Sequence, residues 1–213
     1  MGRKMKKLTP LLLVLLLMAS CQKDPDTSKL SGNFLVYTDY DTSENFKNFD
    51  TFYIPDSILL ITSSKTPSYW NNEQSEELLT TVIDNMTKYG YNQVMDKEFA
   101  DVGIQVSYIE STYYFTNYSS PYWWWDYPGY WYPGYWGGYW NSWYYPYTVS
   151  YNYTTGSLLI EMIKLDTQSK KIPIIWNAYM SGLLYSSNRL NLQLAVDAVE
   201  QAFEQSSYLN KQN

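Results

Sequence analysis

The side chains best suited to chemistry are carboxylates, which cluster in three places. Two carboxylates that face each other across a cleft can hydrolyse a glycosidic bond. One cluster, however, falls in the first turns of a predicted helix, where negative charge suits the helix dipole, and Asp101 stands at the head of a predicted strand. We therefore favour structural roles and keep a carboxylate-dependent hydrolase as a minor alternative. The clusters are Asp39 with Asp41, Glu73 with Glu76 and Glu77, and Asp96 and Glu98 with Asp101.

Other kinds of catalysis lack their usual residues. The chain has no histidine, which removes the commonest general base and metal ligand. No serine lies in a Gly-x-Ser-x-Gly turn, and the sequence contains neither a glycine-rich phosphate loop nor a metal-ligand spacing. The sequence predicts a protein that is not an enzyme, with no catalytic residue, no metal site and no cofactor.

A signal sequence explains the single cysteine, Cys21. A basic start is followed by an apolar run from Leu11 to Met18 and the small residues Ala19 and Ser20, which is the order of a secretory signal. The run is too short to cross ~30 Å of hydrocarbon as a permanent helix, which needs about 20 residues. Met18-Ala19-Ser20-Cys21 resembles the bacterial lipobox. The resemblance implies cleavage after residue 20 and acylation of Cys21, with acyl chains such as palmitate anchoring the mature chain to a membrane.

The residues after Cys21 bear on where that membrane is. Gln22-Lys23-Asp24-Pro25-Asp26 resembles the short acidic signal that carries lipoproteins of the Bacteroidetes to the outer face of their outer membrane. The alternative is that residues 21–32 form only a solvated tether between lipid and domain. We predict a lipid-anchored protein of the cell outer membrane, with surface exposure favoured over the periplasmic face.

The charge of the mature chain argues against polyanionic partners. Removing residues 1–20 takes away four of the 15 basic residues and none of the 21 acidic ones, which leaves a net charge of −10. This balance repels nucleic acid and anionic lipid surfaces. We therefore expect no nucleic-acid partner.

Hydrophobic periodicity predicts one α+β domain at 33–208, followed by a tail at 209–213. We expect strands at 33–40, 50–54, 58–61, 102–108, 157–165 and 172–180, with the third of these short, the strand at 102–108 half-buried and the last two strands forming a hairpin. Apolar residues at helical spacing predict helices at 73–89, capped by Asn71 or Asn72, and at 189–206. The expected fold has two layers: a mixed or largely antiparallel sheet of four to five strands, with both helices on one face.

An aromatic tract interrupts this domain at 113–153. Of its 41 residues, 22 are Tyr, Trp or Phe, and Asp126 is the only charged one. The sequence Tyr-Pro-Gly-Tyr-Trp occurs at 127–131 and again at 132–136, and Pro-Gly favours type II turns. We expect an extended loop at one end of the sheet, because the flanking strands are expected to be neighbours.

Three interpretations of the tract compete. Rigid aromatic side chains could bind an envelope protein or a glycan or touch the membrane interface. In the third interpretation the tract packs as an auxiliary core on its own domain or stays disordered as low-complexity filler. The first is favoured, and its candidate binding residues are Trp123, Trp124, Trp125, Tyr130, Trp131, Tyr135, Trp136, Trp140 and Trp143.

Several motifs in order suggest a family. They are the strand ending at Tyr40-Asp41, then residues 46–54, 100–106 and 156–161, and Ile174-Ile175-Trp176 before the closing helix. Together they resemble the bacterial lipoproteins of the domain of unknown function 4136 family (DUF4136) over nearly the whole mature chain, although Asn177 stands where that family often has Arg. The resemblance implies the fold and an envelope location and supplies no activity.

A second modification site is suggested near the second strand. Asp56-Ser57-Ile58 resembles the three-residue site at which Bacteroidetes attach O-glycans to exported proteins. The resemblance implies O-glycosylation of Ser57, and the alternative is a turn after Pro55.

Overall fold

The computed structural model describes residues 34–62, 68–110, 142–144, 146, 154–165, 171–185 and 189–212, with the side chains of 142–144 and 171 left out. The chain divides into two compact units, Met1–Ser31 and Gly32–Asn213. The first unit, which includes Cys21, lies outside the described residues. The second unit is the domain considered below.

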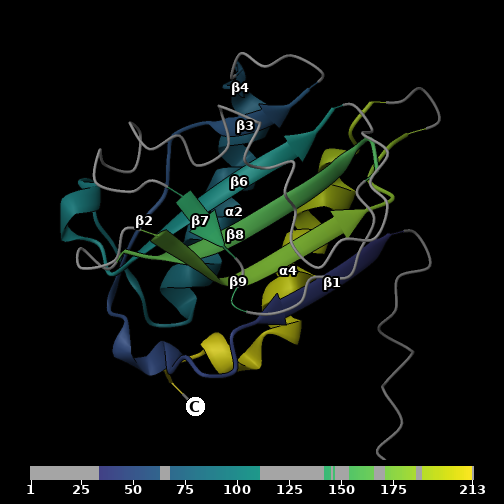
Figure 1. The fold of residues 1–213 in the computed structure, drawn as a ribbon. Coiled ribbons are helices and arrows are strands. Elements are labelled where there is room, and N and C mark those ends of the chain that lie inside the picture. The colour runs from purple at the N-terminus through teal and green to yellow at the C-terminus, as the bar shows by residue number, and fades with distance from the viewer. Residues whose placement is uncertain are drawn as a thin grey trace, which may run out of the picture. The chain divides into compact units, whose positions relative to one another are not determined.

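The described part of the domain is a sheet with two helices (Figure 1). The main sheet runs in the order β1-β9-β8-β6-β2-β5, with β3 beside the far half of β6, β4 beside β3, and β7 beside the start of β9. Its strands are β1 (Leu35–Tyr40), β2 (Thr51–Tyr53), β3 (Ile58–Ile61), β4 (Ser68–Trp70), β5 (Asn92–Gln93), β6 (Val102–Ile109), β7 (Ser142–Tyr144), β8 (Ser157–Lys164) and β9 (Lys171–Ser181). The helices are α2 (Glu73–Lys88) and α4 (Leu192–Gln205), with 3₁₀ turns η2 (Phe46–Asn48), η3 (Lys97–Phe99) and η5 (Ser207–Leu209).

The α+β class, the two-helix layer and the mixed sheet are confirmed, but the expected number of strands and the largely antiparallel alternative are wrong. The structure describes nine strands rather than four to five. Four pairings, β2-β5, β2-β6, β3-β6 and β7-β9, are parallel, while the hairpin β8-β9 and the pairs β6-β8, β1-β9 and β3-β4 are antiparallel. The missed strands, β4, β5 and β7, span only two or three residues, too few to show a period of two.

The ends of both helices follow from local hydrogen bonds. The Asn72 side chain accepts from the backbone N–H groups of Gln74 (3.0 Å) and Ser75 (3.2 Å), and Ser75 Oγ accepts from the Asn72 N–H (2.7 Å). This reciprocal capping box starts α2, and Gly90, at φ +95°, follows its end. Asn191 caps α4 by accepting from the Leu194 N–H at 3.3 Å.

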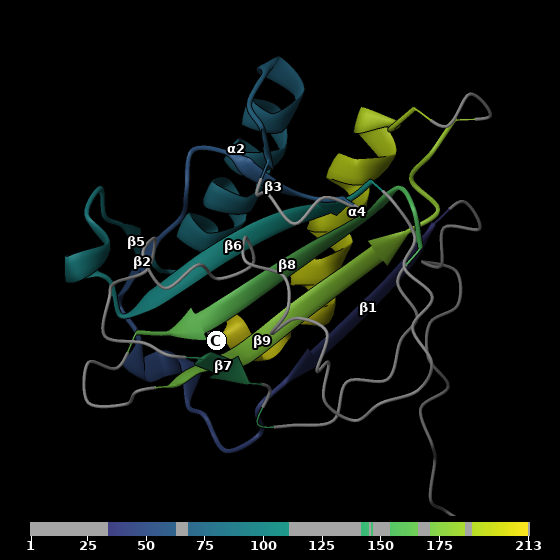
Figure 2. The same ribbon diagram turned by 45° about the horizontal axis from the view of Figure 1, so that its top comes forward.

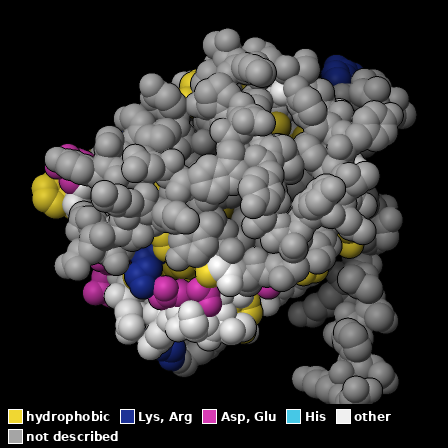
Figure 3. All heavy atoms as spheres, in the orientation of Figure 1, with side chains coloured by type: hydrophobic (Ala, Val, Ile, Leu, Met, Phe, Trp, Pro, Cys, Tyr) yellow, Lys and Arg dark blue, Asp and Glu magenta, His cyan; other side chains and the backbone are white. Residues whose placement is uncertain are grey.

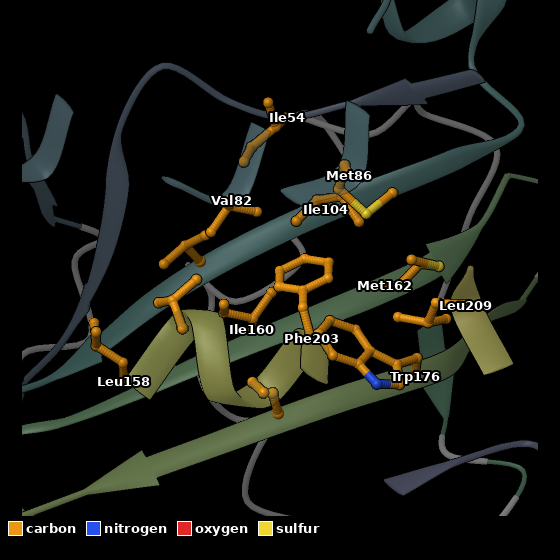
Figure 4. Close-up of a cluster of buried hydrophobic side chains, with 14 of the residues drawn as sticks. Ile54, Val82, Met86, Ile104, Leu158, Ile160, Met162, Trp176, Phe203 and Leu209 are labelled. Atoms are coloured by element: carbon orange, nitrogen blue, oxygen red, sulfur yellow. The ribbon is translucent and has the colours of Figure 1, made fainter. Parts of the chain in front are cut away.

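The main core lies between the helices and one face of the sheet (Figure 2). Figure 4 shows Trp176 of β9 beside Phe203 of α4, and their ring centroids are 5.5 Å apart. The Trp176 indole N–H donates to Ser206 Oγ at 2.9 Å, so the buried ring keeps its hydrogen bond. Leu158, Ile160 and Met162 of β8 point into this core.

Side chains alternate along a strand, so the intervening residues of β8 point to the opposite face, which we call the second face. Residues on this face are also buried: Leu159, Glu161 and Ile163 are 0% exposed. On β6, Gln105 and Ser107 are 6% and 0% exposed. The expectation of a half-buried β6 is therefore wrong, because both faces of this strand are covered.

Candidate functional site

The aromatic tract enters and leaves the domain at one point. Ile109, at the end of β6, is the register partner of Ser157, at the start of β8. The Gly156 N–H donates to the Ile109 carbonyl at 2.7 Å, which closes the base of the insertion. Gly156 has φ +80°, and a Cβ atom at this position would overlap the Leu184 side chain, so the base needs glycine. The insertion is thus held between two antiparallel neighbours, as the sequence predicted.

Part of the tract pairs with the sheet. β7 runs parallel to the first residues of β9, with Ser142, Trp143 and Tyr144 in register with Lys171, Ile172 and Pro173. Trp143 is therefore the one predicted binding residue whose backbone the structure describes. The others, Trp123, Trp124, Trp125, Tyr130, Trp131, Tyr135, Trp136 and Trp140, lie outside the described residues, as does Cys21.

A row of polar side chains crosses the second face. Gln105 of β6 is in register with Glu161 of β8, Glu161 with Asn177 of β9, and Asn177 with Asp39 of β1. Glu161 and Asn177 are both 0% exposed. Four neighbouring strands thus place amide and carboxyl groups side by side in a face that is otherwise largely apolar.

Glu161 is the most perturbed acid of this row. Burial raises the pKa of its carboxyl well above the ordinary value, because the charged form loses its hydration. Burial therefore favours the neutral carboxylic acid, which can donate one hydrogen bond and accept others. Gln105 uses its own amide to donate to the Val106 carbonyl at 2.8 Å. Among the described residues, no group of three or more acidic or cysteine side chains could hold a metal ion.

Hydroxyl groups join the end of the tract to the second face. The Thr154 N–H donates to the Tyr179 hydroxyl at 3.0 Å. Ser157 Oγ lies 3.0 Å from the same hydroxyl and 2.9 Å from Thr154 Oγ1. On the same face, Ser107 is in register with Leu159, and its Oγ is buried without a hydrogen-bond partner among the residues that the structure describes.

The acidic clusters that the sequence offered for catalysis have structural roles. Asp101 accepts from the N–H groups of Asp50 (2.7 Å) and Thr51 (2.9 Å) and from Thr51 Oγ1 (3.0 Å). Burial alone would raise the pKa of Asp101, but these hydrogen bonds and the charge of Lys211 lower it. Asp96 caps η3 by accepting from the Glu98 N–H, and Glu73 and Glu76 lie in the first turn of α2.

Asp39 and Asp41 have local hydrogen-bond partners, and Ser57 lies in a bend. Asp39 accepts from the Tyr40 N–H at 2.9 Å, and Asp41 accepts from the Ser43 N–H and hydroxyl at 2.9 Å and 2.7 Å. Ser57 is half-buried in the bend between β2 and β3, after the exposed Asp56. Its O-glycosylation stays a prediction.

Figure 3 shows acidic and basic side chains next to each other at the lower left of the described surface, with further charged side chains at the upper left and upper right. One ion pair joins Lys164 Nζ, at the end of β8, to Glu44 Oε1 at 2.9 Å. Both side chains are partly exposed, so the pair contributes little stability. No helix in the described ranges is long and apolar enough to cross a membrane.

Sequence reasoning missed the polar row. Glu161 stands between Ile160 and Met162 in an apolar strand, and period two places it with Leu159 and Ile163. A lone acid on an apolar face was the available signal. Gln105 and Ser107 gave no such signal, because polar residues alternating with apolar ones fit a half-exposed strand equally well.

The fold and the insertion define the class: an α+β domain with two helices on one face of a mixed sheet and an aromatic insertion between β6 and β8. The chain belongs to the domain of unknown function family DUF4136, whose profile matches residues 36–206. It is similar to the crystal structure of a DUF4136 family protein from Bacteroides thetaiotaomicron VPI-5482, with 50% identity and a TM-score of 0.76, over 85% of this chain and 100% of the other.

Two more distant solved structures also match. A PelC dodecamer from Paraburkholderia phytofirmans has 10% identity and a TM-score of 0.41, over 84% of this chain and 99% of the other. A PDZ domain protein from Parabacteroides distasonis ATCC 8503 has 13% identity and a TM-score of 0.39, over 82% of this chain and 36% of the other. A search of the curated proteins found no match.

Proposed function

We propose that this chain is a lipid-anchored outer-membrane protein that binds an envelope protein or a glycan through its aromatic insertion and catalyses no reaction. The observation that chiefly supports binding is the place of the insertion: it starts and ends at the paired residues Ile109 and Gly156, at one end of the sheet. Binding residues are often found on loops that a rigid scaffold positions.

The composition of the insertion suits recognition. Trp and Tyr side chains provide large contact areas at low cost in conformational entropy, and their hydroxyl and indole groups add hydrogen bonds. Flat aromatic faces also stack on the C–H faces of sugars. With Asp126 as the only charge at 113–153, we expect a partner recognised by contact area and hydrogen bonds rather than by ion pairs.

The roles of the carboxylates support a non-catalytic protein. Glycoside hydrolysis needs two carboxylates facing each other across the substrate. Asp101 accepts a hydrogen bond from the Asp50 backbone N–H, and Asp96 accepts one from the Glu98 backbone N–H. Glu161 is fully buried. The minor hydrolase alternative thus has no supporting pair among these groups.

The second candidate function is a structural envelope component whose tract packs on its own domain or on the membrane interface. The pairing of β7 with β9 favours this alternative, because it shows one part of the tract attached to the sheet. The two functions are compatible only if another part of the tract remains available to a partner.

A deletion tests the binding function. Removing residues 121–140 spares β7 and both ends of the insertion. We expect the variant to keep its circular dichroism spectrum and melting behaviour and to lose saturable binding to purified outer-membrane proteins and envelope polysaccharides. Both proteins would carry Cys21→Ser, so that binding is measured on soluble chains.

The matched control removes exposed hydrophobic side chains elsewhere. Met95 and Phe99 are 89% and 72% exposed, near β5 and η3, so Met95→Ser with Phe99→Ser should leave binding unchanged. Equal binding by the deletion variant and the parent would refute a binding role for residues 121–140. Loss of folding in the deletion variant would favour the structural alternative.

A further inference from the structure

The first strand, β1, forms one edge of the main sheet. It pairs with β9 over all six of its residues, and no strand in the described part of the chain pairs with its outer side (Figure 2). The other strands with a single described partner, β4, β5 and β7, have only three, two and three residues. Short edge strands are one way in which proteins prevent edge-to-edge pairing. By its length, β1 is the described edge best able to accept another strand.

The register with β9 shows which backbone groups of β1 point outward. Just after the end of β1, the Asp41 N–H donates to the Ile175 carbonyl of β9 at 2.9 Å. In an antiparallel pair, alternate residues direct both their N–H and C=O groups to the partner strand. The odd-numbered residues of β1 therefore bond to β9, and the even-numbered ones, Val36, Thr38 and Tyr40, direct these groups outward. Donors and acceptors that recur at every second residue match the backbone of an extended chain.

The side chains along this edge differ between its two ends. The Asp39 carboxylate accepts from the Tyr40 N–H at 2.9 Å, and this N–H is one of the outward groups. Asp39 thus places a negative charge at the outer side of the strand. Toward the start of the strand, Leu35 is 59% exposed and Tyr37 is 37% exposed. Residues of one parity share one face, so this face of the edge is apolar at its start and acidic at its end.

We infer that β1 binds an extended segment of a partner protein by strand addition. Main-chain hydrogen bonds to Val36 and Thr38 hold the segment, an apolar side chain packs beside Leu35, and a Lys or Arg lies beside Asp39. A second copy of this chain is a less suitable occupant, because it brings the same acidic groups and a net charge of −6. The inference goes beyond the proposed function, because it concerns β1 rather than the aromatic insertion.

Two short peptides test strand addition to the Cys21→Ser protein. Acetyl-Thr-Leu-Thr-Val-Thr-Lys-Thr-amide and the peptide of reversed sequence present the apolar and basic side chains on one face in the two possible strand directions. We expect at least one peptide, near saturation, to slow amide hydrogen exchange at Val36 and Thr38 at least ~10-fold, because the new hydrogen bonds must open before exchange. Glu in place of the peptide Lys should weaken binding about 5-fold, because repulsion replaces attraction between the strands.

N-methylation of the peptide provides a control that leaves the protein unchanged. Of two adjacent backbone nitrogens in an added strand, one faces β1 and the other faces water. Methylating the Val nitrogen and methylating the next Thr nitrogen should therefore differ: one change weakens binding at least ~10-fold, and the other has little effect. Equal effects of the two methyl groups would overturn the inference, as would a failure of both parent peptides to protect Val36 and Thr38 at about 1 mM.

A pair of protein variants tests the same hydrogen bond from the other side. Thr38→Pro removes an outward N–H and leaves the pairing with β9 in place, so it should weaken peptide binding at least ~10-fold. Thr38→Val keeps the N–H and should bind as the parent does. If Thr38→Pro does not fold, the methylated peptides decide alone. Protection of Val36 and Thr38 that rises with protein concentration, without peptide, would identify a second copy as the occupant and overturn the assignment to a partner protein.

The peptide experiment is independent of the deletion experiment. Removing residues 121–140 leaves β1 unchanged in sequence, so the deletion variant should bind the peptides as its parent does. Failure of one proposal is thereby distinguishable from failure of the other.

Discussion

Glu161 is an acid in a place where a charge is expensive. It is 0% exposed in the middle of β8, and burial raises its pKa well above the ordinary value. The register places Gln105 and Asn177 on either side of it, and these are neutral amides rather than cations. A neutral carboxylic acid can share hydrogen bonds in such a row, whereas a carboxylate would lack a compensating charge among these neighbours.

The raised pKa predicts a pH-dependent stability. The folded state holds the Glu161 proton to higher pH than the unfolded chain does, so its stabilising effect is complete below the unfolded pKa of about 4.3. That effect is lost as the pH rises from there through the folded-state pKa. In Glu161→Gln the side chain cannot ionise. We expect its free energy of unfolding to approach that of the wild type near pH 4 and to exceed it increasingly at higher pH, by about 1.4 kcal/mol per pH unit up to the folded-state pKa.

Urea denaturation of the wild type and of Glu161→Gln between pH 4 and pH 9 measures this difference. Glu200→Gln, on the exposed side of α4, is the matched control and should follow the wild-type profile. Wild-type and Glu161→Gln curves that stay parallel over the whole range would show that Glu161 ionises alike in both states.

The longer elements could be predicted from the sequence because each has its own periodicity. The strand at 58–61 and both long helices fall where apolar spacing placed them, within three residues at every end. The parallel pairing of β2 and β3 with one edge of β6 was not predictable, because residues more than 40 positions apart form these ladders. Strand order depends on packing over the whole sheet rather than on local pattern.

The candidate site was likewise only partly predictable from the sequence. Composition placed the aromatic insertion at 113–153, between strands expected to be neighbours, and the observed register of Ile109 with Ser157 agrees with that expectation. The polar row was not predictable, because Gln105, Glu161 and Asn177 come together only through the register of three strands. Burial of the second face was likewise not predictable, because alternating polar and apolar residues also fit a half-exposed strand.

The start of α2 offers a test of one local prediction, the Asn72 cap. Its side-chain oxygen accepts from two backbone N–H groups and from the Trp70 indole at 2.7 Å. Asn72→Ala removes these bonds and should lower the free energy of unfolding by about 1 kcal/mol. Asn72→Asp keeps an acceptor in place and should lose much less. Urea midpoints measure both, and an unchanged midpoint for Asn72→Ala would mean that tertiary packing alone fixes this end of the helix.

At the scale of the molecule, anchoring and charge act together. If acyl chains hold the domain at Cys21, as we propose, it would meet envelope partners at a high effective concentration, so that individually weak contacts would suffice. Without residues 1–20 the chain would carry a net charge of −10, which disfavours contact with anionic surfaces. The charge-poor insertion is the exception on this acidic molecule, and it therefore suits contact with partners that the rest of the chain would repel.

The proposed attachment to the outer membrane, and the face on which the domain would lie, are testable on intact cells. If residues 22–26 act as an export signal, proteinase K added to whole cells should remove the protein, while a periplasmic marker survives. A variant with Lys23, Asp24 and Asp26 replaced by alanine keeps Cys21 and its lipid, and it should become protected, because the anchor remains and the acidic address is lost.

Lipid on both proteins is verified by intact mass, and Cys21→Ser should lack it and leave the membrane fraction. Survival of the wild type in the treated cells would rule out surface exposure and assign residues 21–32 to the role of a tether. Loss of both proteins would mean that the domain reaches the surface by information outside residues 23–26. The face also decides which partners the insertion can contact. A periplasmic insertion meets peptidoglycan, and a surface one meets external glycans.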